Sequence, residues 1–360
     1  MRILITGSDG YIGSLMVPFM RRAGHDVTGL DTRYFQEATL GEPPAGDALP
    51  IITKDIRHVE PADLAGFEAV LHLAGLSNDA LGQLSQSVTY AINHDASVRL
   101  AEMAKQAGVS RFVYASSCSV YGKSDADIVD ETSPVDPQTD YARCKVLDER
   151  AFTALAGDRF SPTFLRNATA YGASPRMRFD LVVNNLSGLA WTTTRIALLS
   201  DGTPWRPIVH VLDICAAFQA VLDAPREVVH NAVLNVGQND ENFQIRDIAT
   251  CIAEVFPGCA LSFGASDPDQ RSYRVNFDRI TRTLPHFRCQ WPLRRGAEQL
   301  RELYGRVHLT DAMFRSKPFT RLAQLKHLID TGRLDADFFW TTAPSPRGNA
   351  SGRLPGSRSV

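Results

Sequence analysis

Tyr141 and Lys145 are a pair of residues whose types and spacing could support proton transfer. Residues four apart share one face of a helix. A nearby ammonium lowers the pKa of a phenol, so that the tyrosine can exchange a proton at neutral pH. The Y-x-x-x-K spacing is common on surface helices, and a second feature is needed before it indicates catalysis.

A run of hydroxyl side chains supplies that second feature. Ser116, Ser117 and Ser119 follow an apolar segment that reads as a strand, and they precede Tyr141 by 20-odd residues. In an open parallel sheet, a hydroxyl at the C-terminal end of a strand points into the crevice where ligands bind. A site containing these serines, Tyr141 and Lys145 is therefore expected at that edge.

The glycines at the start of the chain predict what binds there. An apolar segment at residues 2–6 leads into Gly7-x-x-Gly10-x-x-Gly13, which opens a helical pattern. Such glycines allow a tight turn, a close approach to a diphosphate and close packing of helix on strand. Asp31 ends the next predicted strand, where its carboxylate can bind ribose hydroxyls and repel a 2′-phosphate. The motif predicts NAD rather than NADP, although Arg33 partly offsets the charge of Asp31.

The elements that must position these residues alternate between strands and helices in the first half of the chain. Apolar strands alternating with helices are typical of an α/β fold with a doubly wound, Rossmann-type parallel sheet. Strands are expected at 2–6, 26–31, 69–74, 111–116 and 233–236, and helices at 12–23, 93–107, 141–155 and 245–255.

The alternation weakens after about residue 170, which predicts a smaller mixed lobe for substrate. We expect a cofactor domain at 1–168, to which 205–236 contributes, and a lobe that is mainly 169–335. Residues 341–360 are rich in Ser, Pro, Gly and Arg and read as a disordered tail.

Composition excludes several classes of protein. The 360 residues are 44% hydrophobic and 22% charged, with a net charge of -2, so nothing favours nucleic acid or a membrane surface. The six cysteines are scattered, and no His, Asp or Glu cluster has metal-ligand spacing, so we expect reduced thiols, no metal and a cytoplasmic protein. His72, in an apolar strand, and His210 are expected to be structural.

With these motifs assembled, the sequence resembles the extended short-chain dehydrogenase/reductase superfamily, in its nucleotide-sugar epimerase, dehydratase and reductase branch. The resemblance runs from residue 1 to roughly 300. It rests on TGSDGYIG, the strand end at Asp31, KDIR at 54–57, HLAG at 72–75, SSCSVYG at 116–122, YARCK, LRN at 165–167 and RPIVHVLD at 206–213.

The resemblance implies a role for each matching position. Ser117 would bind the reacting hydroxyl, Tyr141 would be the general acid/base, and Lys145 would hold the nicotinamide ribose. The implied cofactor-binding residues are Gly7, Asp9, Gly10, Tyr11, Ile12, Gly13, Asp31, Asp55, Ile56, Leu73, Ala74, Gly75, Asn93, Ser116, Tyr141 and Lys145. The implied substrate-binding residues are Ser77, Ser117, Cys118, Ser119, Thr169, Arg176, Asn185, Arg206 and Arg271, the last two for a diphosphate.

The sequence departs from its relatives at informative positions. Cys118 and Ser119 stand where the 4,6-dehydratases carry Asp-Glu, so that elimination lacks its acid and base. Ser77 stands where a classical 4-epimerase has a lysine near the cofactor phosphates, and Thr169 stands where many relatives have a substrate-binding Asn. The segment 174–180 carries two arginines that could read sugar or phosphate, or could simply be solvated.

The favoured expectation is an NAD-dependent nucleotide-diphosphate-sugar epimerase of carbohydrate biosynthesis, acting at C4 through a transient keto-sugar. The alternative is a 4-keto nucleotide-sugar reductase that uses NAD(P)H. Such an enzyme would use the same Ser117, Tyr141 and Lys145, but for a single reduction step. A non-catalytic NAD(P)-sensing protein is a third possibility, which the retained Tyr and Lys disfavour. The helices at 93–107 and 140–155 have Ala-rich apolar faces, which in relatives form a dimer interface, so a homodimer is expected.

Overall fold

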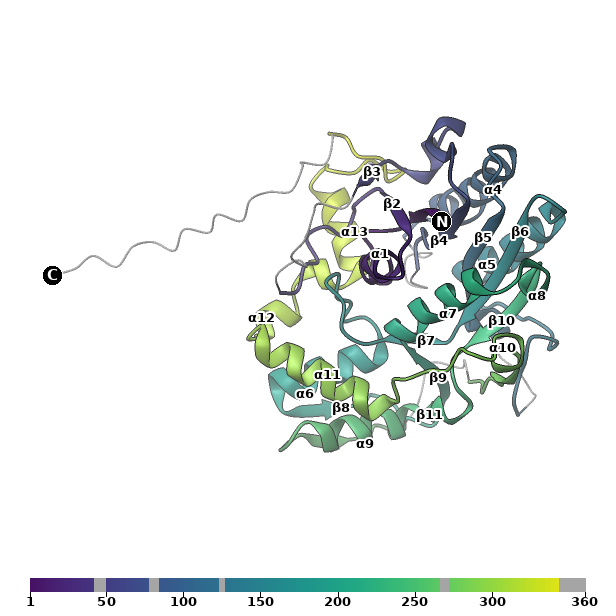
Figure 1. The fold of residues 1–360 in the computed structure, drawn as a ribbon. Coiled ribbons are helices and arrows are strands. Elements are labelled where there is room, and N and C mark those ends of the chain that lie inside the picture. The colour runs from purple at the N-terminus through teal and green to yellow at the C-terminus, as the bar shows by residue number, and fades with distance from the viewer. Residues whose placement is uncertain (42–49, 78–83, 123–126, 266–271, 343–360) are drawn as a thin grey trace.

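A seven-stranded parallel sheet forms the centre of the molecule in this computed structural model, which describes residues 1–41, 50–77, 84–122, 127–265 and 272–342 (Figure 1). The strand order is β10-β6-β5-β4-β1-β2-β3, and each neighbouring pair is parallel. The strands are β1 (Arg2–Thr6), β2 (Asp26–Asp31), β3 (Ile51–Thr53), β4 (Ala69–His72), β5 (Arg111–Ser117), β6 (Ser161–Asn167) and β10 (Ala232–Val236). The order reverses beside β1, which confirms the predicted doubly wound sheet and places a ligand crevice at its C-terminal edge.

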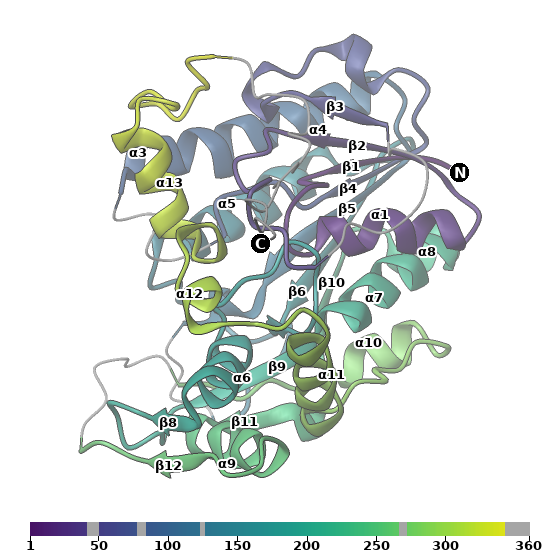
Figure 2. The same ribbon diagram turned by 90° about the vertical axis from the view of Figure 1, so that its left-hand side faces the viewer.

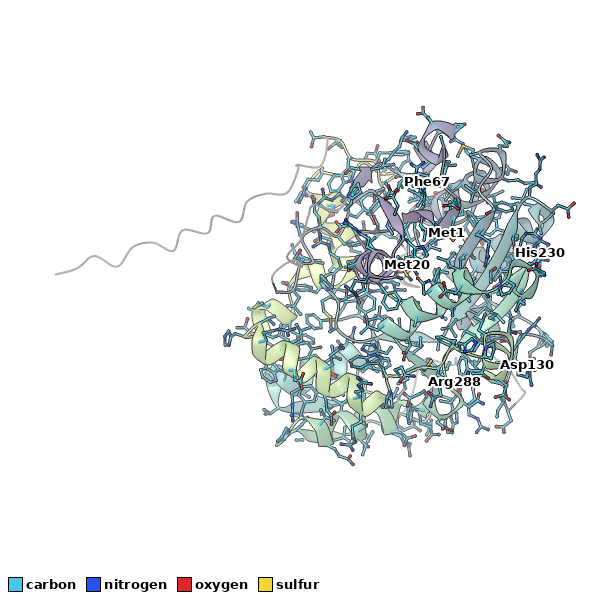
Figure 3. The ribbon with its side chains drawn as sticks, in the orientation of Figure 1. Met1, Met20, Phe67, Asp130, His230 and Arg288 are labelled. Carbon is cyan, nitrogen blue, oxygen red and sulfur yellow. The ribbon has the colours of Figure 1, made fainter. Side chains whose placement is uncertain are left out.

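Helices cover both faces of this sheet, as the continuous apolar strands predict. On one face lie α1 (Gly13–Arg22) and α7 (Val211–Asp223) (Figure 1), which bury Met16, Met20 and Phe218. Figure 3 labels Met20 on α1. On the other face, α4 (Ala96–Gln106) and α5 (Asp140–Leu155) bury Leu100 and Phe152. Burial of a large apolar side chain contributes about 1.5–3 kcal/mol.

Before α4, the expected helix at 93–107 begins with a π-helical turn, Ala91–Asp95. Such turns occur often at functional sites. The turn carries Asn93, whose amide both accepts from Leu76 N at 2.7 Å and donates to Leu76 O at 3.1 Å.

A smaller lobe lies beside the C-terminal edge of the sheet (Figure 2). Its three-stranded sheet has the order β11-β9-β7, so β9 pairs within the lobe while the following α7 and β10 return to the large sheet. The lobe elements are β7 (Thr169–Tyr171), α6 (Val182–Thr193), β8 (Arg195–Ala197), β9 (Trp205–His210), β11 (Asn242–Gln244), α9 (Ile245–Val255), β12 (Ala260–Ser262) and α11 (Leu293–Arg306). Residues 205–236 are thus divided between the two parts: β9 pairs within the lobe sheet, while β10 pairs with β6 of the large sheet and α7 packs on it.

The end of the described chain crosses back from the lobe to the edge strands β2 and β3 (Figures 1 and 2). Leu325, Leu328 and Phe338 pack into the same core as Tyr34 and Ile56. Residues 321–340 therefore contact the large sheet at its β2–β3 edge, and most of them fall in the range 169–335 that we expected to be mainly lobe. The elements here are α12 (Asp311–Phe314), η6 (Lys317–Phe319) and α13 (Arg321–Asp330). The tail prediction falls almost wholly on residues 343–360, outside the described residues.

Short elements complete the chain: η1 (Ile56–His58), η2 (Pro61–Leu64), α3 (Gln86–Tyr90), η4 (Cys118–Tyr121), α8 (Arg226–Val229), η5 (Asn239–Glu241) and α10 (Asp278–Thr283). Within the described ranges, no helix is long and apolar enough to cross a membrane, and no group of three His, Cys, Asp or Glu side chains could hold a metal ion.

His72 and His210 both have structural roles, as expected. His72 is fully buried between Thr6 and Ser97, and burial lowers its pKa to about 3. His210 is buried too, hydrogen-bonded to Gln299 and stacked on Trp291.

Candidate active site

A cleft of about 580 Å³ lies at the C-terminal edge of the large sheet, between that sheet and the lobe. This volume is typical of a small-molecule or cofactor site. It is lined by most of the residues that the sequence singles out: Gly7, Gly10, Tyr11, Ile12, Gly13, Asp31, Asp55, Ile56, Leu73, Ala74, Gly75, Ser77, Ser116, Ser117, Ser119, Tyr141, Lys145, Thr169 and Arg206.

The glycine loop is built as its spacing predicts. Gly7 has a φ of 71°, a left-handed conformation that glycine adopts without strain. A Cβ atom on Gly13 would overlap the carbonyl oxygen of Gly7, so the helix can begin this close to the strand only with glycine. The N-terminus of α1 thereby faces the cleft with main-chain N–H groups, an arrangement that binds phosphate.

Asp31 lies at the end of β2, on the rim of the same cleft. Its carboxylate accepts the main-chain N–H of Asp9 at 2.9 Å and of Arg33 at 2.5 Å. Each carboxylate oxygen has two lone pairs, so acceptor capacity remains for ribose hydroxyls. Burial and the neighbouring Asp9 raise the pKa of Asp31 to about 6, which leaves it ionised at neutral pH.

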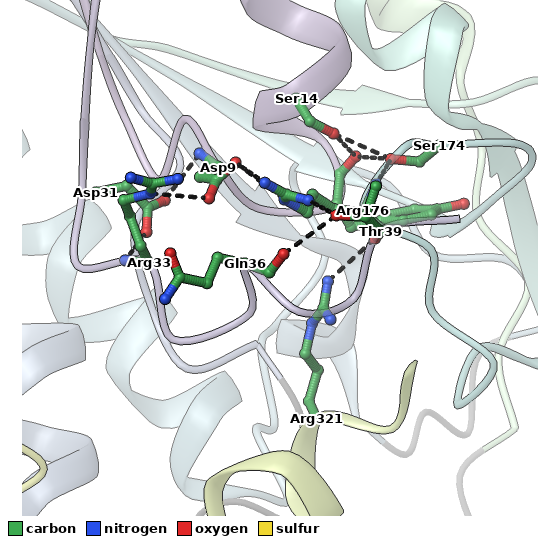
Figure 4. A network of polar contacts seen from close by, with 10 residues as sticks. Asp9, Ser14, Asp31, Arg33, Gln36, Thr39, Ser174, Arg176 and Arg321 are labelled. Atoms are coloured by element: carbon green, nitrogen blue, oxygen red, sulfur yellow. Dashed lines mark hydrogen bonds and ion pairs between the residues drawn. The ribbon is translucent and has the colours of Figure 1, made fainter. Parts of the chain in front are cut away.

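Asp9 does not line the cleft, although the resemblance implies a cofactor contact. Its carboxylate is held between Arg176, at 2.7 and 2.9 Å, and Arg33, at 3.4 Å (Figure 4). Arg176 also hydrogen-bonds Thr39 (Figure 4). Arg176 therefore fastens the lobe segment to the glycine loop, and nothing places it in the cleft as a substrate contact.

The proposed catalytic residues converge on the cleft from two elements. Thr139 caps α5 by accepting the N–H of Ala142 at 3.2 Å, which fixes the first turn that carries Tyr141. Lys145 Nζ lies 5.4 Å from the centre of the Tyr141 ring. Ser117 ends β5, and its Oγ accepts the N–H of Ser119 at 3.1 Å.

Lys145 is 6% exposed, and burial lowers the pKa of its ammonium to about 8. Its charge is favoured by Asp148, the largest of the opposing influences. At neutral pH the ammonium keeps its proton and stabilises the ionised form of the neighbouring phenol. These residues can therefore bind a substrate hydroxyl and exchange its proton.

Buried polar networks hold the ends of the strands behind this site. Ser116 Oγ donates to Glu149 at 2.6 Å, and Glu149 is paired in two places with Arg166, at 2.6 and 3.0 Å. Arg166 donates in turn to Tyr121 at 3.1 Å. The hydroxyl of Ser116 is thus hydrogen-bonded within the core. Ser116 still lines the cleft, but with its other atoms.

Three more predicted residues make contacts away from the cleft lining, and a fourth cannot be placed. Asn93 holds the loop after β4 through Leu76 and does not line the cleft. Cys118 is 1% exposed, its thiol donates to Arg166 O at 3.1 Å, and burial raises its pKa. Asn185 donates to Phe179 O at 2.9 Å, away from the cleft lining. Arg271 lies outside the described residues.

The Asp55 carboxylate is also engaged, because it pairs with the Arg57 guanidinium at 2.7 and 3.0 Å and caps η1. Asp55 lines the cleft next to Ile56, so its main chain rather than its charge is free to flank an adenine.

The structure adds cleft residues that the sequence did not assign. Arg178, not Arg176, is the arginine of 174–180 that lines the cleft; it pairs with Asp180 at 2.9 Å and donates to Ser77 Oγ at 2.9 Å. Asn167, which also lines the cleft, buries its side-chain Oδ1 without a hydrogen-bond partner among the described residues. Arg321, from α13, also lines the cleft. In 174–180 the two arginines alternate with apolar residues, a pattern that is compatible with one arginine facing the cleft. No motif in the sequence around Arg321 indicated that it would line the cleft.

These features fit a dinucleotide. The loop after β1 excludes a side chain at Gly7 and Gly13, the α1 N-terminus offers donors to a diphosphate, and the Asp31 carboxylate offers acceptors to a ribose.

Comparison with known proteins agrees with this geometry. The model of the NAD dependent epimerase/dehydratase family matches residues 3–237. UDP-glucose 4-epimerase of Corynebacterium glutamicum is 27% identical over 270 residues, which cover 71% of this chain and 80% of that protein. UDP-glucose 4-epimerase of Mycolicibacterium smegmatis is 33% identical over 235 residues, which cover 61% and 72%.

A solved structure of MoeE5 in complex with UDP-glucose and NAD is 29% identical and superimposes with a TM-score of 0.73, over 86% of this chain and all of MoeE5. The fold, the glycine loop and the Ser-Tyr-Lys cleft thus lead to one conclusion: this chain belongs to the NAD dependent epimerase/dehydratase family, as an NAD-dependent enzyme of the extended short-chain dehydrogenase/reductase type.

Proposed function

We propose that this protein is an NAD-dependent epimerase of nucleotide-diphosphate sugars that inverts C4 through a transient 4-keto-sugar. The observation that carries the proposal is the position of Ser117, Tyr141 and Lys145 on the same cleft as the glycine loop. A proton-exchanging phenol beside a dinucleotide site is the minimum that reversible oxidation of a carbinol requires.

The chain's own part in the reaction is proton transfer and positioning. Tyr141 takes the proton of the C4 hydroxyl and returns it after the sugar has turned its other face. Ser117 holds the same oxygen by a hydrogen bond, and Lys145 keeps the phenol acidic. Bound NAD would supply reversible acceptance of the hydride.

The residues after Ser117 favour epimerisation over 4,6-elimination. Elimination needs an acid and a base beside the sugar's C5 and C6. Cys118 is buried away from the cleft with a raised pKa, and Ser119 is a hydroxyl. Neither side chain replaces a carboxylic acid at neutral pH.

The relatives suggest which substrate to test first. Two are named UDP-glucose 4-epimerase, and MoeE5 binds UDP-glucose. Arg206, on β9, lines the lobe side of the cleft and is suited to a substrate diphosphate. We therefore propose a UDP-hexose as the substrate class.

The proposal is tested by incubating purified protein with UDP-glucose and UDP-galactose without added cofactor, and by following both epimers by NMR. Interconversion in both directions, with the nucleotide that copurifies unchanged in amount, supports an epimerase. No interconversion of the two epimers, together with stoichiometric oxidation of NADH or NADPH when a 4-keto nucleotide sugar is supplied, would show a reductase instead.

We also propose a cytoplasmic homodimer, in which α4 and α5 form the interface. The two helices lie side by side on one face of the sheet. Light scattering of the purified protein decides the oligomeric state, and charge substitution of exposed α4 and α5 positions should give monomers. We assign residues 1–168 with α7 and β10 to cofactor binding, and most of 169–310 to the substrate lobe.

A further inference from the structure

Arg321 is a buried cation without an acidic partner in the described part of the chain. It is 3% exposed, and no described carboxylate lies within 4.0 Å of its guanidinium. Its polar contacts are main-chain carbonyls, Arg176 O at 3.1 Å (Figure 4) and Pro318 O at 3.4 Å. Its guanidinium stacks 4.2 Å from the centre of the Phe35 ring. Burial and then Arg178 lower its pKa to about 9. A buried charge with no counter-charge is costly, so its retention points to an anionic partner.

The position of Arg321 in the cleft indicates which anion. Arg321 lines the same cleft as the glycine loop and Asp31, and its guanidinium stacks on Phe35, in the loop that follows Asp31. The guanidinium is therefore placed on the side of the cleft that carries the dinucleotide-binding features. The diphosphate is the middle of a dinucleotide and its only anionic part.

Arg178 is another arginine that lines the cleft. It donates to Ser77 Oγ at 2.9 Å, and its charge is already balanced by a two-point pairing with Asp180. Arg321 has no such pairing within the described part of the chain, so its charge is available to a bound anion.

The segment that carries Arg321 is firmly attached to the cofactor side. Tyr34 donates to Phe338 O at 2.5 Å, and Trp340 Nε1 donates to Thr32 O at 2.7 Å. Arg333 pairs with Glu37 at 2.6 Å. These contacts tie residues 317–340, the C-terminal strap, to the loop that follows Asp31.

We propose that Arg321 binds the diphosphate of the dinucleotide cofactor, so that the C-terminal strap completes a cofactor site whose other parts lie within residues 3–237. A nucleotide sugar carries a diphosphate too, but the stacking of Arg321 on Phe35, just after Asp31, favours the cofactor. The inference rests on the NAD site of the proposed function and not on the sugar.

The test measures ligand binding by calorimetry on full-length protein freed of bound nucleotide. Arg321→Gln is expected to bind NAD and ADP-ribose about 10- to 100-fold more weakly, the loss typical of one charged hydrogen-bonding contact. Binding of UDP should not change. Arg321→Lys should recover part of the affinity, because it keeps the charge but not the fork. The unfolding temperature of the ligand-free Arg321→Gln protein should be equal to or above that of the wild type, because an unbalanced charge is removed.

Arg333→Gln is the matched control, because it removes an arginine of the strap that pairs with Glu37 outside the cleft. It should leave NAD affinity within twofold of the wild type, a margin of about 0.4 kcal/mol. Unchanged NAD and ADP-ribose affinity in Arg321→Gln would overturn the proposal. So would selective loss of UDP binding, which would assign Arg321 to the substrate, or an equal loss in Arg333→Gln, which would make the strap merely structural. Binding is read directly, so a failure of sugar interconversion leaves this result unaffected.

Discussion

The ammonium of Lys145 lies 5.4 Å from the centre of the Tyr141 ring and 4.3 Å from that of Tyr114. The charge thus lies near two aromatic rings, and one of them is that of the proposed acid/base, Tyr141, one helical turn away. Tyr114 donates to Asp148 at 2.5 Å, so its phenol is engaged away from the reaction. Tyr141, which lines the cleft, is the phenol placed to act on substrate.

Tyr141→Phe should lower kcat by a factor of about 100 to 10,000, the usual contribution of general acid–base catalysis. NAD should still bind, because the glycine loop is untouched. Kinetics of UDP-sugar interconversion and the amount of copurified nucleotide check both points. Tyr90→Phe, at a half-buried position outside the cleft lining, should keep wild-type turnover. Full turnover in Tyr141→Phe would remove Tyr141 from the catalytic role.

Lys145 makes the stability of the ligand-free protein depend on pH. Its pKa is about 8 in the folded state and 10.5 when unperturbed. Below pH 8 both states hold the proton, and burial of the charge destabilises the fold by a constant amount, on the order of 3 kcal/mol. From pH 8 to 10.5 the folded state has released a proton that the unfolded state still holds, so stability from this group rises with pH.

Lys145→Met removes this charge, so its stability relative to the wild type should be highest below pH 8 and should decline as pH rises toward 10.5. Urea unfolding of both proteins from pH 7 to 10 measures the difference. Lys105→Met, on the exposed side of α4, is the control: its free energy of unfolding should change with pH in the same way as that of the wild type. Parallel curves for Lys145→Met would show that the buried lysine does not titrate in this range.

Gly13→Ala should abolish NAD binding and destabilise the protein by about 1–3 kcal/mol, because the new Cβ overlaps the carbonyl oxygen of Gly7. Calorimetric titration and thermal unfolding measure the two effects. Gly157→Ala is the control: a Cβ there has no atom within 4 Å, and the change should stay within about 0.5 kcal/mol. Normal NAD affinity in Gly13→Ala would contradict the loop's role.

Asp31→Asn should raise the affinity for NADP relative to NAD by about 10- to 100-fold, because the repulsion of a 2′-phosphate is lost. The wild type should show the same trend as pH falls through about 6, where Asp31 takes up a proton. Titrations with both cofactors at pH 5 and pH 7.5 check this. Asp26→Asn, exposed at the start of β2, should leave the ratio as in the wild type. If the ratio of NADP to NAD affinity changed neither with pH nor in Asp31→Asn, other groups would determine the choice of cofactor.

Local patterns in the sequence predict the sheet, its covering helices and the core of the site. Gly7, Gly13 and Asp31 are recognisable because they lie within one βαβ unit, after the first strand, at the start of the helix and at the end of the second strand. Tyr141 and Lys145 are recognisable because one helical turn brings them together. These relationships depend on neighbours along the chain, and the periodicity of apolar residues records them.

The remaining features depend on contacts between distant parts of the chain. Arg176 and Arg178 lie two apart in an irregular segment, and only the position of Asp9 decides that Arg176 turns outward. Arg321 reaches the cleft because Tyr34 and Phe338, 304 residues apart, pack and hydrogen-bond. No local spacing encodes such contacts.

The central claim, inversion at C4 by reversible oxidation, is tested most directly with a UDP-hexose that carries deuterium at C4. The account predicts that NMR shows the C4 epimer forming without added cofactor and with the deuterium still at C4, because the transferred hydrogen returns to the carbon it left. Loss of the deuterium, or formation of an epimer only with added NADH or NADPH, would contradict it.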